Sequence, residues 1–253
     1  MDRPKDTSWQ KVSKQYNESV GEAGNYFHQN VIIPGVIKLL NLQPNDSVLD
    51  LGCGQGVLAR QLPKTIFYQG VDLARDLIEA AQKMDHNPLH RFVVGNITKS
   101  LPINKTDFTA AAIVLALQNI ENPQETLNIA SKHLRQKGKL VMVINHPCFR
   151  IPRQSSWAFE EERKIQYRRI DRYLSPIKIP INSQPSKGEH GVFTWSFHYP
   201  LESYSEFLNK AGFVIETIEE WASDKTSQGR LARMENRARA EIPLFMAILA
   251  SKK

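Results

Sequence analysis

A glycine-rich turn is the part of this sequence whose residue types and spacing could do chemistry. It ends the run Val48-Leu-Asp-Leu-Gly-Cys-Gly-Gln-Gly56, in which Asp50 precedes three glycines at alternate positions, Gly52, Gly54 and Gly56. Glycines let backbone amides approach a ligand closely, because no Cβ stands in the way. We therefore expect a small-molecule site at this turn, with an apolar strand before it and a helix directly after it.

The spacing and the charge of the turn favour one class of ligand. From the glycines alone, the turn could equally bind a nicotinamide or flavin dinucleotide, or be a tightly packed turn that binds no ligand. However, the spacing is G-x-G-x-G, and Val57 stands where the third glycine of a dinucleotide-binding turn would fall. Asp50 would repel a pyrophosphate, whereas it would attract a ligand that carries an ammonium and a sulfonium. S-adenosylmethionine is such a ligand, and we predict it as the cofactor.

Two further polar positions follow the next apolar runs. Asp72 ends the second run, twenty positions after Gly52. One carboxylate there can accept hydrogen bonds from both hydroxyls of a ribose, although a helix N-cap is the alternative role. After the third run, Asn96 and Ile97 offer a polar side chain and an apolar neighbour to the edge and face of an adenine.

Short apolar runs and amphipathic helical patterns alternate around these positions, which is typical of βαβ units and a parallel sheet. We expect strands at residues 47–51, 68–73, 91–97, 110–117 and 139–145, helices at 74–84 and 125–136, a helical segment over 1–40, and a later helix at 201–213 followed by strands at 214–221 and 242–250. Residues 146–193 show no clean period, and we expect them to form most of an inserted, irregular lid over 146–198.

The sequence resembles the class I S-adenosylmethionine-dependent methyltransferases. The segments VLDLGCGQG, GVDL, VVGNITKSLP and VLALQNIENP stand in the order and spacing of that family, and the match covers residues 41–145. The resemblance implies an α/β, Rossmann-like, doubly wound fold with a mostly parallel seven-stranded sheet whose last strand is antiparallel, an N-terminal helical cover and an insert after the fifth strand. It also implies direct methyl transfer to an O, N or C acceptor.

The resemblance also implies roles for individual residues. In the family, the first segment wraps the methionine end of the cofactor, the second holds ribose, the third holds adenine, and the end of the fourth strand lines the methyl-transfer site. Carried to this sequence, the positions are Asp50, Gly52, Cys53, Gly54 and Gly56; Asp72 and Leu73; Asn96 and Ile97; and Leu115 with Gln118. The adenine position is usually acidic, so Asn96 would replace a charge-assisted bond with a weaker neutral one.

Several residues outside these segments have both a possible functional role and a purely structural interpretation. Trp9, Tyr16, Tyr26 and His28 could close over the cofactor or form a helical core stripe. His146 and His198 are candidate general bases near the expected sheet edge, although a lone histidine more often packs or lies on the surface. Cys148 could be a nucleophile, but a single cysteine is more often inert. We predict no metal site.

The segment 146–198 should decide the acceptor. Between His146 and His190 it holds nine Lys or Arg against five Asp or Glu, interleaved with aromatic residues. One interpretation is a lid over a small metabolite, held by an arginine clamp; the other is an RNA-binding surface. We favour the metabolite, because the basic residues are mixed with Glu160–Glu162 and no appended RNA-binding module is visible. A third hypothesis is a cofactor-binding module without catalysis. We disfavour it because every expected binding segment is intact.

Length and composition fit one large α/β domain over residues 1–253, made of a cover (1–40), a cofactor-binding core (41–145), the insert (146–198) and a C-terminal part (199–253). No apolar run reaches the length of a membrane span, and the polar N-terminus lacks a secretory signal, so we expect a soluble, cytoplasmic protein with two free cysteines. The net charge of +7 permits an anionic partner but is common on ordinary enzymes.

Overall fold

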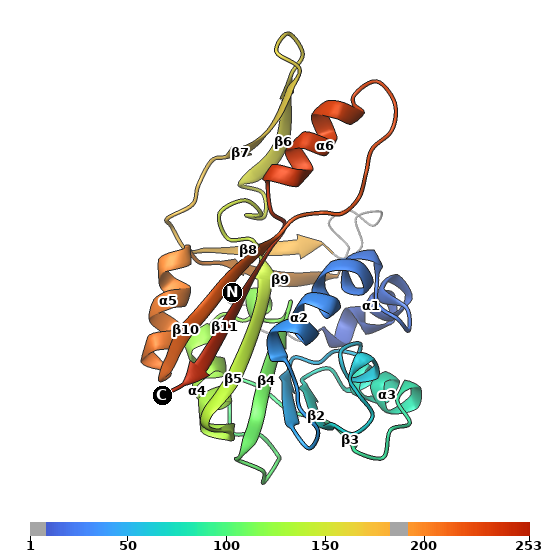
Figure 1. Cartoon of the computed structure of the whole chain (residues 1–253), viewed down its shortest axis with the longest axis vertical. Coiled ribbons are helices and arrows are strands. Elements are labelled where there is room, and N and C mark those ends of the chain that lie inside the picture. Colours follow the sequence, from blue (N-terminus) through green and yellow to red (C-terminus); the bar gives the residue numbers. More distant parts are fainter. Residues whose placement is uncertain (1–8, 183–191) are drawn as a thin grey trace.

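A seven-stranded sheet forms the centre of the computed structural model, which describes residues 9–182 and 192–253 (Figure 1). The strand order is β10-β11-β5-β4-β1-β2-β3. The strands are β1 (Ser47–Leu51), β2 (Phe67–Asp72), β3 (His90–Val94), β4 (Phe108–Val114), β5 (Leu134–Asn145), β10 (Phe213–Trp221) and β11 (Phe245–Lys252). All neighbours pair in parallel except β11, which is antiparallel to both β5 and β10. The fold predicted from the sequence is confirmed.

Helices cover both faces of the sheet. The helices α1 (Ser13–Val20), α2 (Ile33–Leu40) and α3 (Arg75–Met84) pack on one face, and α4 (Pro123–His133) and α5 (Leu201–Lys210) pack on the other. Along β5, Val141 and Val143 belong to the first core, while Leu140 and Met142 belong to the second. Central strands buried on both faces read as continuous apolar runs, which is why the sequence located them well.

The helix expected directly after the glycine turn is the clearest local error. Residues after Gly56 form turns and a single 3₁₀ turn, Ala59–Gln61, instead of an α-helix. The reason is Pro63, because the residue before a proline is driven out of the helical region, and Leu62 is indeed extended at φ −77° and ψ 154°. Too few residues remain between Gly56 and Pro63 for an α-helix.

Other boundaries also differ from the expectation. The helix expected over 125–136 ends at His133, and β5 starts at Leu134, earlier than predicted. Between β10 and β11 the chain forms an unpredicted helix, α6 (Ala232–Glu241). The helix expected over 201–213 ends at Lys210, because Gly212 takes the left-handed conformation at φ +83° that commonly follows a helix.

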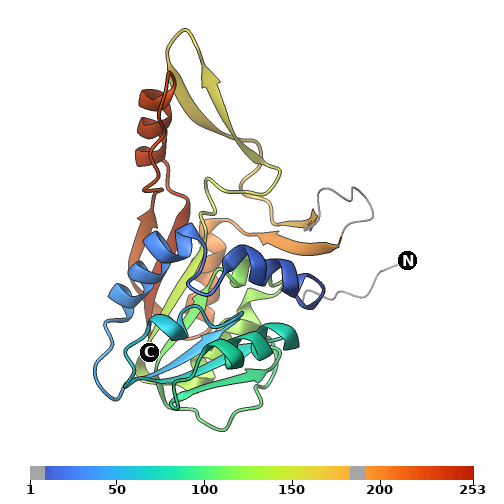
Figure 2. The same ribbon diagram turned by 90° about the vertical axis from the view of Figure 1, so that its right-hand side faces the viewer.

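The insert is more regular than its composition suggested. It forms two β-hairpins, β6 (Ser155–Glu160) with β7 (Ile165–Ile170), and β8 (Ile177–Asn182) with β9 (Phe193–His198). The part of the predicted lid at 183–191 lies outside the described residues, as do residues 1–8 of the predicted cover. Figure 2 shows that β6–β7 projects away from the sheet beside α6, whereas β8–β9 lies across the end of the domain near α1. The expectation of one irregular lid was therefore wrong.

Within residues 9–182 and 192–253, no helix combines the length and the apolar character that crossing a membrane requires. Both cysteines in these ranges, Cys53 and Cys148, are free thiols.

The packing of α4 yields a stability prediction. Leu127 is fully buried, with 0% of its surface exposed, in the core between α4 and the sheet. Replacing it with alanine leaves a cavity, so Leu127→Ala should lower the free energy of unfolding by about 2–5 kcal/mol, measured by urea denaturation. Leu174→Ala, at a side chain that is 69% exposed, is the matched control and should change it by less than about 0.5 kcal/mol. Equal losses in both variants would contradict this packing.

Candidate active site

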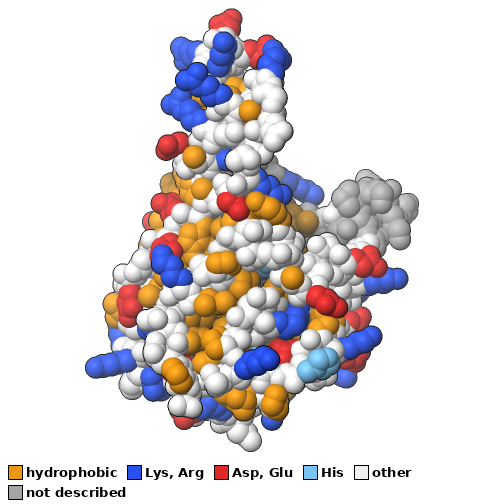
Figure 3. Space-filling model, turned by 45° about the vertical axis from the view of Figure 1, so that its right-hand side comes forward, with side chains coloured by type: hydrophobic (Ala, Val, Ile, Leu, Met, Phe, Trp, Pro, Cys, Tyr) orange, Lys and Arg blue, Asp and Glu red, His pale blue; other side chains and the backbone are white. Residues whose placement is uncertain are grey.

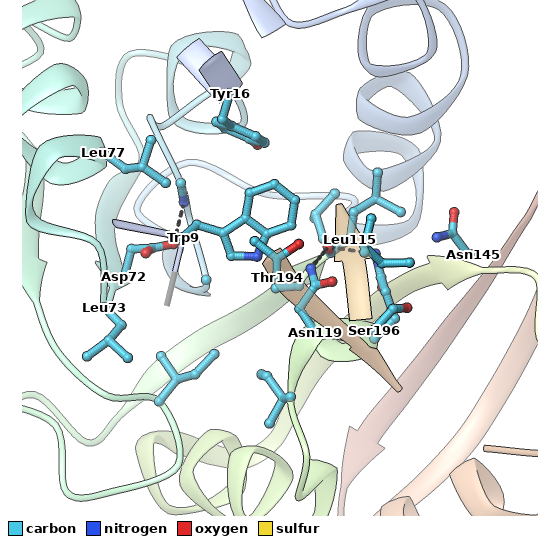
Figure 4. Close-up of a pocket in the computed structure, with 18 of the residues that line it drawn as sticks. Trp9, Tyr16, Asp72, Leu73, Leu77, Leu115, Asn119, Asn145, Thr194 and Ser196 are labelled. Atoms are coloured by element: carbon cyan, nitrogen blue, oxygen red, sulfur yellow. Dashed lines mark hydrogen bonds between the residues drawn. The ribbon is translucent and has the colours of Figure 1, made fainter. Parts of the chain in front are cut away.

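A cavity of about 930 Å³ lies at the carboxyl ends of the parallel strands, where ligands of doubly wound sheets bind. The segments after β1, β2, β3 and β4 form one part of its wall. Trp9 and Tyr16 from the N-terminal cover and Thr194 and Ser196 from β9 form another part (Figure 4). The cavity is thus enclosed by the predicted cofactor segments, the cover and the second hairpin of the insert.

The glycine turn lies against the neighbouring segments with no room for side chains. Gly52 has φ +83°, and a Cβ there would come within 2.5 Å of the Cβ of Ala116, just after β4. Gly54 has φ +54°, and a Cβ there would lie 3.3 Å from the hydroxyl of Tyr16. Only glycine adopts this left-handed backbone at little cost, so the spacing of the glycines follows from the geometry of the turn.

Asp72 connects the turn to the end of β2. Its Oδ2 accepts a hydrogen bond from the Gly54 amide at 3.0 Å, and its Oδ1 accepts one from the Ala74 amide at 2.8 Å. Burial raises the pKa of Asp72, while these amide donors oppose the shift. The alternative role as helix cap does not hold, because α3 begins at Arg75 with Ala74 as its cap residue. The carboxylate is therefore oriented on the cavity wall with lone pairs left for a ligand.

Asp50 lies beneath the turn and is only 2% exposed. Its Oδ2 accepts a hydrogen bond from the Tyr68 hydroxyl at 2.6 Å, whereas its Oδ1 is buried without a partner among the described residues. Burial raises the pKa of Asp50 to about 7. A buried carboxylate oxygen without a partner is costly, and a cation bound above the turn would offset that cost.

The end of β4 carries a strained residue. Leu115 has φ +53°, an uncommon conformation for a bulky side chain. Its carbonyl accepts hydrogen bonds from Gln118 Nε2 at 2.7 Å and Asn119 Nδ2 at 3.3 Å. The Oε1 of Gln118 is buried without a partner in the described part of the chain. Strain of this kind persists where surrounding contacts hold it, and it clusters at functional sites.

The segment after β3 contributes Asn96 and Ile97 to the cavity wall, which also includes Leu73. The Oδ1 of Asn96 accepts hydrogen bonds from the Thr98 amide at 2.9 Å and the Thr98 hydroxyl at 2.8 Å. This local turn uses the carbonyl of Asn96, which agrees with the weaker adenine contact expected of an amide at this position.

Most of the predicted cofactor residues come together on the wall. They are Gly52, Gly54, Asp72, Leu73, Asn96, Ile97, Leu115, Gln118 and Tyr16. Asp50, Cys53 and Gly56 belong to the turn but do not line the cavity. Tyr26 lies elsewhere: its side chain is 41% exposed, its hydroxyl donates to Asp224 at 3.1 Å, and Lys225 stacks on its ring. The position of Tyr26 does not support its predicted contact with the cofactor.

The two histidines predicted as general bases do not line the cavity. The Nε2 of His146 lies 2.6 Å from Glu220, and its Nδ1 accepts the Cys148 amide at 3.2 Å. The Nε2 of His198 lies 2.6 Å from the carbonyl of Tyr173. Their positions near the expected sheet edge suggested that both were general bases. In the folded chain, however, both rings are hydrogen-bonded to other groups of the protein. The geometry does not support a catalytic role for either histidine.

The predicted arginine clamp is also absent from the described wall. Arg150 stacks on Phe245, with its Cζ 5.0 Å from the ring centre, and Arg168 stacks on Trp157 at 5.2 Å. Arg169 pairs with Asp171 at 2.7 Å. Among the described residues that line the cavity, none is Lys or Arg.

Sequence reasoning missed several polar residues of the wall. They are Asn25, Asn119, Asn122, Thr194 and Ser196. Thr194 and Ser196 alternate along β9, so a period-two pattern was present, but the two strands of the hairpin are short and one contains Pro180. Asn119 ends the 3₁₀ turn Leu117–Asn119, and Asn25 and Asn122 lie in loops; such short or irregular segments give no periodic signal.

The cavity lies where doubly wound sheets bind their ligands, and residues 49–142 match the family model described as "Methyltransferase domain". The chain therefore carries a methyltransferase domain at these residues, and it has the fold of the class I S-adenosylmethionine-dependent methyltransferases. It is 28% identical over 182 residues to a demethylmenaquinone methyltransferase of Tropheryma whipplei, covering 70% of each chain. It is 30% identical over 112 residues to an uncharacterized 37.1 kDa protein in transposon TN4556 of Streptomyces fradiae, covering 42% of this chain but only 32% of that protein.

The fold of a solved S-adenosylmethionine dependent methyltransferase from Mesorhizobium loti is similar, with a TM-score of 0.67 and 22% identity over 86% of this chain and 96% of that one. S-adenosylmethionine supplies a methyl group bonded to a positively charged sulfur. The described residues fit this ligand, because the buried Asp50 oxygen lacks a partner and the wall offers a carboxylate at Asp72 but no competing cation. Within the described part of the chain, no cluster of three or more metal-ligating side chains occurs.

Asp72 gives a direct binding prediction. Because Asp72→Asn removes a charge-assisted acceptor from the wall, it should weaken the binding of S-adenosylhomocysteine by about 1.5–3 kcal/mol, measured by calorimetry. Asp107→Asn, at an exposed carboxylate paired with Lys105, is the control and should leave the affinity unchanged. An unchanged affinity in Asp72→Asn would disprove this role.

Asp50 gives a pH prediction for the ligand-free protein. Its pKa is 3.8 in the reference state and about 7 when folded, so the folded protein holds the proton more tightly. Stability contributed by the protonated carboxyl is therefore lost as the pH rises between these values. The free energy of unfolding of Asp50→Asn should therefore rise relative to that of the wild type by up to about 4 kcal/mol from about pH 4 to about pH 7. A pH-independent difference in urea denaturation would rule out the raised pKa.

Proposed function

We propose that this methyltransferase acts on an uncharged small molecule bound between the cofactor segments and the β8–β9 hairpin. The composition of the wall beyond the cofactor residues carries this proposal. Apart from His28 and Glu121, that part consists of amide, hydroxyl and apolar side chains, among them Asn119, Asn145, Ile181, Thr194 and Ser196. The described wall offers no Lys or Arg to a carboxylate or phosphate. A neutral acceptor with hydrogen-bonding groups matches such a surface.

The size of the cavity supports a small acceptor. Its volume of about 930 Å³ is near the upper end of the range for single-ligand sites, which leaves space for a cofactor together with a compact second ligand. The relative from Tropheryma whipplei is named for a quinone, which is an uncharged ring system with polar oxygens. A quinone reduced to its hydroquinone would match the amides and hydroxyls of this wall.

Within this proposal the cavity residues take distinct roles. Gly52 and Gly54 bind the methionine end of the cofactor, with Asp50 beneath them, and Asp72 binds the ribose. Leu73, Asn96, and Ile97 bind the adenine, and Leu115 with Gln118 lines the methyl-transfer point. The lid is the hairpin β8–β9 rather than the whole insert, because only this hairpin and the adjoining Asn145 and Pro152 supply wall residues from that region.

RNA is the second candidate acceptor, and one observation favours it. Basic side chains gather at the projecting end of the molecule (Figure 3). On α6 and the residue before its cap, Arg230, Arg233 and Arg237 are exposed on one helix face, and none forms a hydrogen bond or ion pair with a described residue. This surface belongs to the part that projects away from the sheet, so it supports phosphate binding better than delivery of a base to the cavity.

Ser196 tests where the acceptor binds. Ser196→Leu should raise the KM for 1,4-naphthohydroquinone about tenfold or more, because the larger side chain fills the acceptor space, while the affinity for S-adenosylhomocysteine stays within about twofold. Ser156→Leu, on the exposed β6, is the matched control and should change neither value.

Labelled S-adenosylmethionine distinguishes the alternatives in the same assay. Transfer of the label to bulk RNA, with affinity falling steeply as salt rises, would favour the RNA acceptor over the small molecule. Tight binding of S-adenosylhomocysteine with no turnover of neutral acceptors or RNA would favour a binding module without catalysis.

A further inference from the structure

His28 is a histidine of the N-terminal cover that lies on the wall of the cavity. It begins a π-helical turn, His28–Ile32, directly before α2, and only 8% of its surface is exposed. The side chain of Asn25 accepts the backbone amide of His28 at 3.1 Å, which fixes the start of the turn. Single turns of π-helix beside an α-helix are frequent at functional sites.

The imidazole of His28 differs from those of the other buried histidines. His90, His133, His146 and His198 each have a ring nitrogen within 2.6–2.7 Å of an oxygen of the protein. His28 makes no ring hydrogen bond to any described residue, and its Nδ1 is buried. A buried polar atom left without a partner costs about 1–3 kcal/mol, and no described side chain or backbone group holds the ring in place. The imidazole is therefore not committed to a protein partner and lies beside a cavity that can hold a ligand.

The other titratable groups on the described wall are unsuited to accept a proton. Burial raises the pKa of Tyr16 far enough to keep its hydroxyl protonated. Asp72 already accepts two backbone amides and is placed to bind the cofactor. Glu121 pairs with Lys178 at 3.2 Å and is exposed.

His28 is the remaining titratable group of that wall. Its pKa is lowered by burial, and no charged neighbour contributes to the shift, so the imidazole is neutral at pH 7 with a lone pair to offer. A neutral, desolvated base inside a ligand cavity is the form that general-base catalysis requires.

We propose that His28 accepts the proton of an ionisable hydroxyl on the methyl acceptor, which makes the acceptor a phenol or hydroquinone. This inference rests on the proposed small-molecule function. The hydroxyl O–H bond breaks, its proton moves to the imidazole, and its electron pair stays on the oxygen. The acceptor oxygen then gains the methyl group, the electron pair of the methyl–sulfur bond remains on sulfur, and the positive charge passes from the sulfonium to the imidazolium. Atoms and charge balance without another reactant.

Proton transfer can be measured without methyl transfer by using 4-nitrophenol, whose absorbance distinguishes phenol from phenolate. The probe is titrated with pH on the protein saturated with S-adenosylhomocysteine. An imidazolium beside the bound phenolate should make the apparent pKa of the probe about one to two units lower on wild type than on His28→Gln. His86→Gln, a histidine outside the cavity wall, is the matched control and should behave as wild type.

Turnover of 1,4-naphthohydroquinone gives the second measurement. His28→Gln should lower kcat about 100-fold or more while the affinity for S-adenosylhomocysteine stays within about twofold, and imidazole added to His28→Ala should restore part of the rate. The acid limb of the wild-type pH profile should disappear in His28→Gln. A retained affinity for S-adenosylhomocysteine also shows that the variants are folded.

The two proposals fail in different ways. Equal probe pKa values on wild type and His28→Gln, or no bound phenolate on wild type, would overturn the role of His28 even if methyl transfer occurs. Absence of turnover by wild type, with the probe pKa still dependent on His28, would instead overturn the proposed acceptor and leave the base assignment standing.

Discussion

The close approach of the glycine turn to the neighbouring strand ends is the constraint on which the site depends. The turn must pass the end of β4 with only hydrogen at Gly52, where a Cβ would meet Ala116 at 2.5 Å. The same turn donates its Gly54 amide to Asp72 at the end of β2. Three strand ends are thereby held in one arrangement by backbone contacts, and a cavity forms above them. Moving the turn outward would break the bond to Asp72 and open the wall, so fold and site share this geometry.

Unsatisfied polar atoms lie in the wall of the same cavity and beneath its glycine turn. Asp50 Oδ1, Gln118 Oε1 and His28 Nδ1 are all buried without partners among the described residues, and Leu115 holds a strained backbone beside them. Each feature destabilises the ligand-free protein, and a ligand that supplies charge or a hydrogen bond would offset the cost of the unpaired atoms. The site is therefore prepared for its ligands at the expense of stability, which is how a rigid scaffold gains affinity without rearrangement.

The two hairpins of the insert differ in whether they line the cavity, a difference that the composition of the insert did not indicate. The β8–β9 hairpin places Thr194 and Ser196 on the cavity wall, whereas β6–β7 and α6 carry basic side chains away from it. The arginines that suggested a clamp instead stack on aromatic rings, as Arg150 does on Phe245, or pair with carboxylates. These arginines are therefore held by aromatic and acidic partners, and the β8–β9 part of the cavity wall is left with small polar groups.

The sequence by itself determined the sheet, the cofactor segments and the class of reaction. Its central strands are buried on both faces, and the cavity residues Gly52, Asp72 and Asn96 lie at or just after strand ends, so local pattern and spacing carried the information. Only the tertiary structure decided the acceptor side. His28, Asn119 and Ser196 line the same cavity from segments far apart in the chain. A local sequence pattern cannot predict which distant segments come together. The same holds for His146 and His198, whose partners Glu220 and Tyr173 are 74 and 25 positions away, so that long-range packing, rather than residue type, removed them from the site.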